Sequence, residues 1–383
     1  MNVKDIKNLK SINAFNGEFA IFTEVSSRQG IINRQGEILL PAGEAEDKRI
    51  THICDDLFKV EHFDQLDEYT IEMELDFVFD AKKQERLEQK IVCKLQSGDY
   101  VVQSENKNSN NEYCYGLIDA NFNKVIPAEY NGIMVWKDKV IVTKNGKKQI
   151  IDRKGESVSP LIFDSCVLKN WDAPEMSIAI DGEWFLINDK GQRLTNGKYE
   201  YIEPFNSAGY TIVQLNGRIC IIDKQENLVL STDFTELQNN IFYNKFLTGD
   251  KFAFVENDRC GIMDIRGNVI LPAEYKHIKL YESDVKRVVV VDQFGRQGVI
   301  DTDCNIVIPC QYKLIIYRPQ LEVFKVRNQE NKFGLLDENG NEILPTEYDH
   351  INIGNTYGLD EIAVTKDGEC YFVNSKNQQV KVF

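Results

Sequence analysis

One pattern returns along most of this 383-residue chain and restricts its fold more than any other feature. The pattern is a small residue, two aliphatic residues, Asp or Asn, a short polar turn, more aliphatic residues and Pro, and its clearest copy runs from Gly334 to Pro345. The Asp or Asn position recurs at Asn33, Asp119, Asp152, Asn188, Asp223, Asp264, Asp301, Asp337 and Asn374. The last eight of these are 33, 36, 35, 41, 37, 36 and 37 residues apart. The chain is therefore a tandem array of one unit rather than a set of unrelated domains.

Fixed offsets from this position support the alignment. Pro lies eight residues later at Pro41, Pro127, Pro160, Pro272, Pro309 and Pro345. An aromatic residue follows three residues beyond, at Tyr130, Phe163, Tyr199, Phe234, Tyr275, Tyr312 and Tyr348. An apolar residue follows three further on, at Ile133, Cys166, Ile202, Leu237, Ile278, Ile315 and Ile351. We expect residues 1–383 to form a single repeat domain of about nine to ten units of roughly 36 residues each.

The sequence of each unit predicts short antiparallel strands. The aliphatic pairs on either side of the polar turn predict a β-hairpin, because Asp, Asn and Gly suit such turns. An alternating run upstream, such as Val140 to Thr143, predicts at least one further strand. We expect the Pro to end the second strand of the hairpin, since it has no N–H for a central ladder. The aromatic position is expected to be mostly buried at Tyr130, Tyr275, Tyr312 and Tyr348.

These residues resemble the WG-repeat family of bacterial tandem β repeats. The best copies are Tyr115 to Asp119, Gly261 to Asp264 with Tyr275, and Phe333-Gly334 through Tyr348-Asp349. The name-giving Trp is replaced before the glycine by Tyr115, Cys260, Gln297 and Phe333. The resemblance implies a repeat architecture and interaction roles, and it brings no catalytic residues.

The two ends of the chain are complementary fragments of the repeat. The sequence stops at Phe383, before the Pro and aromatic positions that should follow Asn374, while Ile6 and Leu9 keep the spacing of the aromatic and apolar positions. A propeller-like ring completed by both termini is therefore favoured, because it removes exposed sheet edges. An open β-solenoid or curved array is the alternative.

Residues 55–110 form a divergent unit with an acidic insertion. Between Asp55 and Asp80 there are ten acidic residues against Lys59 alone. The run Phe77 to Asp80 is the candidate repeat core in this region, and Ala81 to Lys90 could form a short exposed helix. The insertion is either a solvated excursion or a docking surface for a basic partner. The candidate partner-binding residues are Asp64, Asp67, Glu68, Glu72, Glu74 and Asp76.

Composition limits the partners and the compartment. The net charge of −15 disfavours nucleic acid and anionic membranes and favours a basic protein. Residues 1–10 lack the apolar run of a signal peptide, and the apolar stretches are too short to cross a bilayer. The nine cysteines include no CxxC pair and are interpreted as buried thiols, so we expect a cytoplasmic protein.

The sequence contains no recognisable catalytic, metal or cofactor motif. His52, His277 and His350 occupy the same repeat position in different units and are expected to be structural, and His62 lies in the insertion. The recurrent Asp is a turn residue, because the twelve-residue calcium pattern never appears. We therefore expect no cofactor, no metal and no enzymatic activity.

Three functions are compatible with this interpretation. The first is a non-enzymatic protein-protein interaction repeat, and the second is an immunity-type protein that neutralises a basic toxin. The third is an enzyme with its site at the centre of a ring. The sequence leaves the partner, the pathway and the oligomeric state open.

Overall fold

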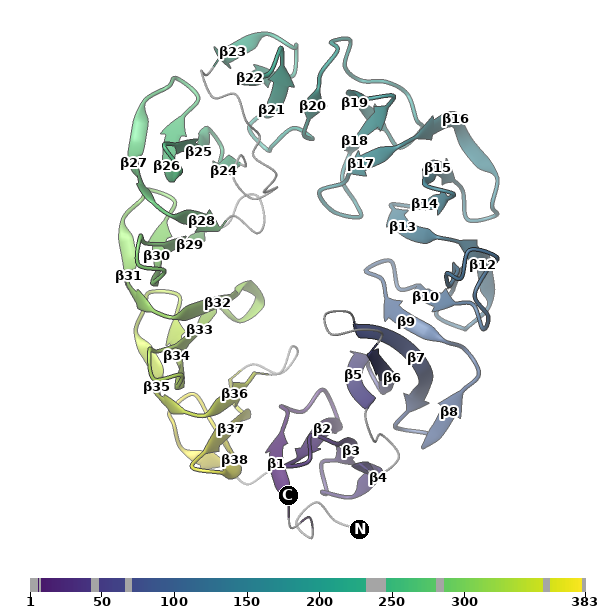
Figure 1. The fold of residues 1–383 in the computed structure, drawn as a ribbon, viewed down its shortest axis with the longest axis vertical. Helices are drawn as coiled ribbons and strands as arrows, with labels where there is room; N and C mark the ends of the chain where they lie inside the picture. The colour runs from purple at the N-terminus through teal and green to yellow at the C-terminus, as the bar shows by residue number, and fades with distance from the viewer. Residues whose placement is uncertain are drawn as a thin grey trace. The chain divides into compact units, whose positions relative to one another are not determined.

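The computed structural model describes residues 6, 8–42, 48–65, 71–231, 246–279, 286–353 and 359–380. Regular structure in this part of the chain is β, apart from one 3-10 turn at Pro319–Leu321. The chain divides into two compact units, of which unit 1 is Met1–Lys124 with Ile316–Phe383 and unit 2 is Val125–Ile315. The strands form small antiparallel sheets, which we call blades and name by their strands (Figure 1).

Unit 1 contains the blades at both ends of the chain. Its strands, with the unit boundaries inside β12 and β32, are β1 (Leu9–Ile12), β2 (Phe19–Glu24), β3 (Gln29–Asn33), β4 (Ile38–Leu40), β5 (Lys48–Cys54), β6 (Leu57–Gln65), β7 (Ile71–Asp80), β8 (Glu85–Leu87), β9 (Ile91–Lys94), β10 (Tyr100–Gln103), β11 (Tyr115–Ile118), β12 (Lys124–Tyr130), β32 (Leu314–Arg318), β33 (Val323–Arg327), β34 (Phe333–Asp337), β35 (Glu342–Tyr348), β36 (His350–Asn352), β37 (Ile362–Lys366), β38 (Glu369–Val373) and β39 (Gln379–Val380).

Unit 2 contains the blades in the middle of the sequence. Its strands are β13 (Gly132–Trp136), β14 (Lys139–Lys144), β15 (Lys147–Ile151), β16 (Ser157–Phe163), β17 (Ser165–Val167), β18 (Glu175–Ile180), β19 (Glu183–Asn188), β20 (Tyr201–Ile202), β21 (Tyr210–Leu215), β22 (Arg218–Asp223), β23 (Leu228–Ser231), β24 (Phe246–Thr248), β25 (Lys251–Glu256), β26 (Arg259–Asp264), β27 (Val269–Tyr275), β28 (His277–Lys279), β29 (Arg287–Val291), β30 (Gln297–Asp301) and β31 (Ile306–Tyr312).

The fold is an all-β tandem repeat of propeller-type blades, as the sequence predicts. In the described residues there are ten sheets, and strands that follow one another in sequence are neighbours in each sheet. Nine sheets have four strands, and blade β17–β19 has three. The predicted hairpin supplies the third and fourth strands of a blade, and the upstream run supplies the second.

The recurrent Asp or Asn closes the turn between the third and fourth strands. At Asp337, Oδ1 accepts hydrogen bonds from the backbone N–H groups of Asn339 and Asn341, at 2.9 and 2.8 Å. The residue three positions after the Asp or Asn has positive φ, with Gly340 at 83° and Glu226 at 61°. The turn role predicted for the recurrent Asp is therefore confirmed.

Our expectation that the recurrent Pro ends the strand holds for Pro41, which directly follows β4, but is corrected elsewhere: the Pro lies inside the fourth strand at Pro127, Pro160, Pro272, Pro309 and Pro345. Pro272 is within β27, an edge strand whose pairing with β26 is interrupted by a register shift between Cys260 and Ile262. A missing N–H is tolerated at an edge and at a bulge. The small residue that opens the pattern makes room there, because a Cβ added at Gly261 would lie 2.6 Å from the carbonyl oxygen of Leu271.

The hydrophobic cores lie between neighbouring blades rather than inside one blade. Ile31 packs in a cluster with Phe58 and Phe79 of blade β5–β8, whereas Ile32 packs in another with Phe372 of blade β36–β39. Successive side chains of a strand point to opposite faces, so the aliphatic pair serves two cores at once. A blade buried on both faces needs consecutive apolar residues, which explains the pattern in the sequence.

The two chain ends meet in unit 1. The guanidinium of Arg34 in the first blade contacts the Glu361 carboxylate beside the last blade at 2.7 Å, and Phe15 and Phe372 lie 5.8 Å apart by ring centroids. Figure 1 shows β1 beside β38. Each terminal blade is a complete four-stranded sheet built from one end of the chain, so the termini pack against each other and do not share one blade.

Two further expectations are corrected. Ala81 to Lys90 forms a turn followed by β8 and not a helix. The aromatic position is buried at Phe163, Tyr199 and Tyr348 but only half-buried at Tyr130, Tyr275 and Tyr312. The following apolar position is buried at Ile202, Ile278, Ile315 and Ile351 and half-buried at Ile133 and Cys166. Phe234 and Leu237 lie outside the described residues.

Candidate interaction sites

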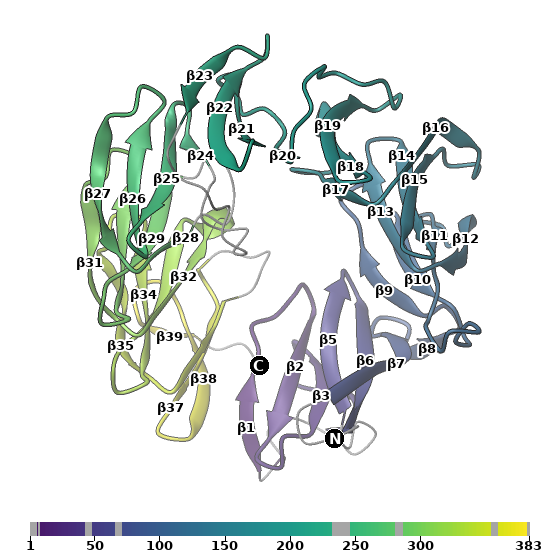
Figure 2. The ribbon, with the colours of Figure 1, turned by 45° about the horizontal axis from the view of Figure 1, so that its top comes forward.

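The acidic segment belongs to the longest hairpin in the described part of the chain. Strands β6 and β7 have nine and ten residues, and Figure 2 shows them side by side. Strand β5 pairs with β6 only as far as His62, and β8 pairs with β7 only at Val78–Asp80. The distal part of the hairpin is therefore a two-stranded extension of blade β5–β8. The candidate repeat core in Phe77 to Asp80 is confirmed, because all four residues are buried.

Two of the six candidate residues form ion pairs within the protein. A Glu74 carboxylate oxygen lies 2.7 Å from Lys107 Nζ, and an Asp76 oxygen lies 2.5 Å from Lys48 Nζ. The hydrogen bond from Lys107 lowers the pKa of the Glu74 carboxyl below its usual value. His62 Nε2 lies 3.7 Å from the other oxygen of Glu74. Glu74 and Asp76 thus anchor the base of the hairpin to blades β9–β12 and β5–β8.

Two other candidate residues occupy facing positions in the ladder. Asp64 on β6 is the register partner of Glu72 on β7, and His62 is that of Glu74. Asp64 and Glu72 are therefore directly opposite positions of the backbone ladder, two residues beyond the pair His62 and Glu74. Like charges at directly opposite positions destabilise a strand pair. Asp67 and Glu68 lie outside the described residues.

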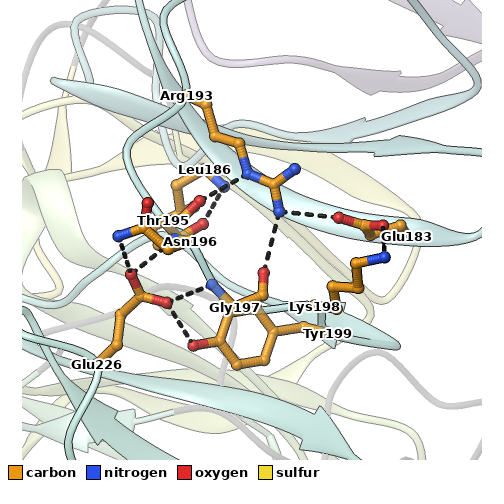
Figure 3. A network of polar contacts seen from close by, with 9 residues as sticks. All are labelled: Glu183, Leu186, Arg193, Thr195, Asn196, Gly197, Lys198, Tyr199 and Glu226. Carbon is orange, nitrogen blue, oxygen red and sulfur yellow. Dashed lines mark hydrogen bonds and ion pairs between the residues drawn. The ribbon is translucent and has the colours of Figure 1, made fainter.

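A polar network in unit 2 occupies the place of a missing strand (Figure 3). Blade β17–β19 has no fourth strand, and the position eight residues after Asn188 is Asn196 instead of Pro. The backbone N–H groups of Asn196 and Gly197 donate to the Glu226 carboxylate, each at 2.7 Å. The buried Tyr199 hydroxyl also donates to Glu226, at 2.8 Å. Glu226 belongs to the turn of the next blade, so the network joins two blades.

The charges in this network are matched to their partners. Partial burial would raise the pKa of the Glu226 carboxyl, but the hydrogen bonds from Asn196, Gly197 and Tyr199 lower it below its usual value. Burial and the Glu226 carboxylate raise the pKa of the Tyr199 hydroxyl. Arg193 Nη2 lies 2.8 Å from Glu183, which completes the cluster. We assign the network a structural role, and we call it the Glu226 clamp.

The last two blades of unit 1, β32–β35 and β36–β39, share one element of this clamp. Tyr348 occupies the same repeat position as Tyr199, and its hydroxyl donates to Asn377 Oδ1 at 2.5 Å. Asn377, like Glu226, lies three residues after the recurrent Asp or Asn and has positive φ, at 59°. The sequence signal for the clamp was present but missed: Glu226 stands where Gly155, Gly191 and Gly267 stand in other units.

A groove of about 600 Å³ lies on unit 2 between edge strands β27 and β31. Its lining includes Tyr275, Ile306 and Pro309, with Phe294 from the turn before β30. Phe294 is 72 % exposed and Ile306 66 % exposed. Leu228 and Val269 occupy the repeat position of Ile306 and are also exposed.

The cysteines and histidines do not assemble into a site. All nine cysteines are free thiols, but only Cys220 and Cys260 are buried and Cys93 is exposed, which corrects their interpretation as buried thiols. In the described residues no group of three or more His, Cys, Asp or Glu could hold a metal ion. Within the same residues there is no helix of the length and apolarity needed to cross a membrane.

Comparison with protein families identifies repeats of a known kind. The model described as "WG containing repeat" matches residues 115–148, 184–218 and 333–359. The second segment includes the Glu226 clamp residues Arg193 to Tyr199, and the third runs from Phe333 through β36. The resemblance that the sequence suggests is thereby confirmed. No curated protein matches the sequence significantly.

Solved structures are similar to this chain at low sequence identity. A crystal structure titled as the eukaryotic initiation factor is 9 % identical, with a TM-score of 0.50 over 80 % of this chain and 93 % of that one. BamB from Moraxella catarrhalis is 12 % identical, with a TM-score of 0.39 over 74 % and 92 % of the two chains. The C-terminal WD40 domain of Sif2 is 9 % identical, with a TM-score of 0.37 over 88 % and 97 %.

Proposed function

We propose that this WG-repeat protein is a non-enzymatic interaction scaffold, and that the hairpin β6–β7 is its docking surface for a basic protein. Repeated blades provide a rigid frame on which one elongated hairpin can present charge to a partner. The observation that carries the proposal is the pairing of Asp64 with Glu72 in the two-stranded extension. The fold gains nothing from two acidic residues at directly opposite positions of a ladder, because like charges placed there cause repulsion.

A basic partner would turn that repulsion into attraction. Glu74 and Asp76 are already matched by Lys107 and Lys48, so they hold the hairpin in place. Asp64 and Glu72 lie further out, where no third strand pairs with the hairpin among the residues that the structure describes. Lys or Arg side chains of a partner would lower the electrostatic energy there, speed encounter and select the partner by charge. The net charge of −15 adds long-range attraction for the same class of protein.

The free thiols fit a reducing compartment, and we place the protein in the cytoplasm on that basis. Lysate of the native host is therefore the appropriate source of the partner. The experiment is affinity capture with three baits: the wild-type protein, the double variant Asp64→Asn/Glu72→Gln, and the matched control Glu330→Gln/Asp360→Asn. The control removes the same charge from exposed positions of unit 1.

The proposal predicts a basic protein that the wild type and the control retain and the hairpin variant loses. Glu74 and Asp76 are left intact, so the anchoring ion pairs of the hairpin remain. An identical set of captured proteins for all three baits would contradict the proposed docking surface. If the protein captured by the wild type and the control is a toxin of the same host, the immunity role becomes the specific form of this function.

A further inference from the structure

Unit 1 contains a cluster of basic side chains around the ring of Phe333. Lys325 Nζ lies 4.6 Å from the ring centroid, the Arg327 guanidinium carbon 5.7 Å, and the His350 ring 6.1 Å. Lys325 and Arg327 are two residues apart on β33, so they share a face, and Phe333 is the register partner of Arg327 on β34. His350 opens β36 of the next blade. We call these three basic residues the Phe333 cluster.

Among the described residues, the cluster lacks the carboxylates that neutralise other basic residues in the same unit. Lys332, for example, pairs with Asp349 at 2.5 Å. In the described part of the chain, neither Lys325 nor Arg327 forms an ion pair. Lys325 Nζ donates instead to the carbonyl oxygen of Ile351. Arg327 Nε is buried and has no hydrogen-bond partner among the described residues. A buried donor without a partner is costly and indicates an absent one.

The local electrostatic field is positive. Burial, and then the charge of Arg318, lower the pKa of the Lys325 ammonium to about 8. Loss of contact with solvent is the main cause that lowers the pKa of the His350 imidazole below 6.5, and the charges of Lys325 and Lys10 add to it. His350 is exposed, whereas Lys325 and Arg327 are half-buried. A small anion would therefore reach the cluster from the side of His350.

We propose that the Phe333 cluster binds a phosphate-type oxyanion, either inorganic phosphate or the phosphate group of a small phosphomonoester. Lys325 supplies a compact point charge, Arg327 a planar fork that includes the unpartnered Nε, and His350 a ring N–H. A single carboxylate carries one negative charge and would be satisfied by Arg327 alone. A phosphate carries nearly two charges at neutral pH and presents oxygens in three directions, which matches donors from two blades. This site is separate from the acidic hairpin.

The test uses the four histidines of the chain as reporters. Their ring C–H signals are followed by nuclear magnetic resonance, and the His350 signal is assigned by its loss in His350→Gln. The full-length protein is titrated with inorganic phosphate, and separately with O-phosphoserine, at constant ionic strength set by chloride. We expect a saturable shift of the His350 signal and a rise in its pKa. Saturation by phosphate alone identifies a free-phosphate site, and saturation by both identifies a phosphomonoester site.

Variants distinguish binding from general ion effects. Lys325→Met and Arg327→Met should each raise the dissociation constant about tenfold or more, which is the usual effect of losing a charged hydrogen bond. Lys82→Met is the matched control, because Lys82 is exposed in the turn before β8, and it should bind like the wild type. Circular dichroism checks folding, and if Arg327→Met does not fold, Lys325→Met decides alone. The proposal is overturned if neither probe gives a saturable shift, or if Lys325→Met binds as tightly as the wild type.

Discussion

The Glu226 clamp makes a prediction that opposes the usual rule for turns. Glu226 has φ of 61°, a conformation that costs a non-glycine residue about 1 kcal/mol and that Gly155 and Gly191 adopt at the same repeat position. If backbone strain were the main effect, Glu226→Gly would stabilise the protein. The clamp predicts the reverse, because the substitution removes the acceptor for two backbone N–H groups and for Tyr199.

The magnitude follows from the hydrogen bonds. Three bonds to a carboxylate contribute roughly 3 kcal/mol once partial exposure is allowed for, and relief of strain returns about 1 kcal/mol. The net loss in the free energy of unfolding should be about 2 kcal/mol. Asp258→Gly is the control, because Asp258 has φ of 57° in an exposed turn, and it should be neutral or stabilising by up to about 1 kcal/mol.

The assay is denaturant unfolding of both variants, with hydrogen exchange of the peptide that contains Asn196 and Gly197. Glu226→Gly should lower the midpoint and accelerate exchange at these two amides, because they lose their acceptor. Glu226→Gln should lie between the wild type and Glu226→Gly. A higher midpoint for Glu226→Gly, or unchanged exchange at Asn196 and Gly197, would refute the clamp.

Three further predictions concern the terminal contact, the aromatic position and the turns. Arg34→Gln should cost about 1 kcal/mol, because it removes the ion pair with half-buried Glu361, and hydrogen exchange should rise in both the first and the last blade; a rise in only one would contradict their contact. Tyr348→Ala should cost about 3–5 kcal/mol and Tyr275→Ala clearly less, because Tyr348 is 2 % exposed and Tyr275 half-buried; equal melting temperatures would refute this ranking. Partial burial opposes the shift, but hydrogen bonds within the turn hold the pKa of the Asp337 carboxyl below 3.8, so the folded state releases this proton more readily than the unfolded state. The turn should therefore stabilise the fold above about pH 4 and lose that contribution as pH falls further. Asp337→Asn should therefore reduce the loss of unfolding free energy below about pH 4. The same pH profile for the variant and the wild type would contradict this prediction.

The unit and its turn could be predicted from the sequence because both rest on local rules. Asp337 closes its turn through atoms only two and four residues away, so its pattern repeats wherever the turn does. The interior position of Pro272 could not be predicted in the same way. A proline signals an edge strand, but the bulge around Cys260 and Ile262 depends on the partner strand.

The candidate sites were less predictable because they depend on contacts between distant segments. The composition of the acidic segment was plain, but its ion pairs join residues 33 positions apart, as in Glu74 with Lys107. The Phe333 cluster brings His350 from the next blade beside Phe333, and its basic residues have no ion-pair partner among the residues that the structure describes. The Glu226 clamp left a trace in the sequence as two coincident departures from the repeat, at Asn196 and at Glu226. Only the contact between blades shows that the two belong together.

The rate of association with the captured partner tests the central claim most directly. It is measured by stopped flow at low and at moderate salt for the wild type, Asp64→Asn/Glu72→Gln and Glu330→Gln/Asp360→Asn. If the acidic hairpin steers binding, the hairpin variant should associate several-fold more slowly at low salt and show a weaker salt dependence, whereas the control should resemble the wild type. Equal rates and equal salt dependence for the wild type and the hairpin variant would contradict the account.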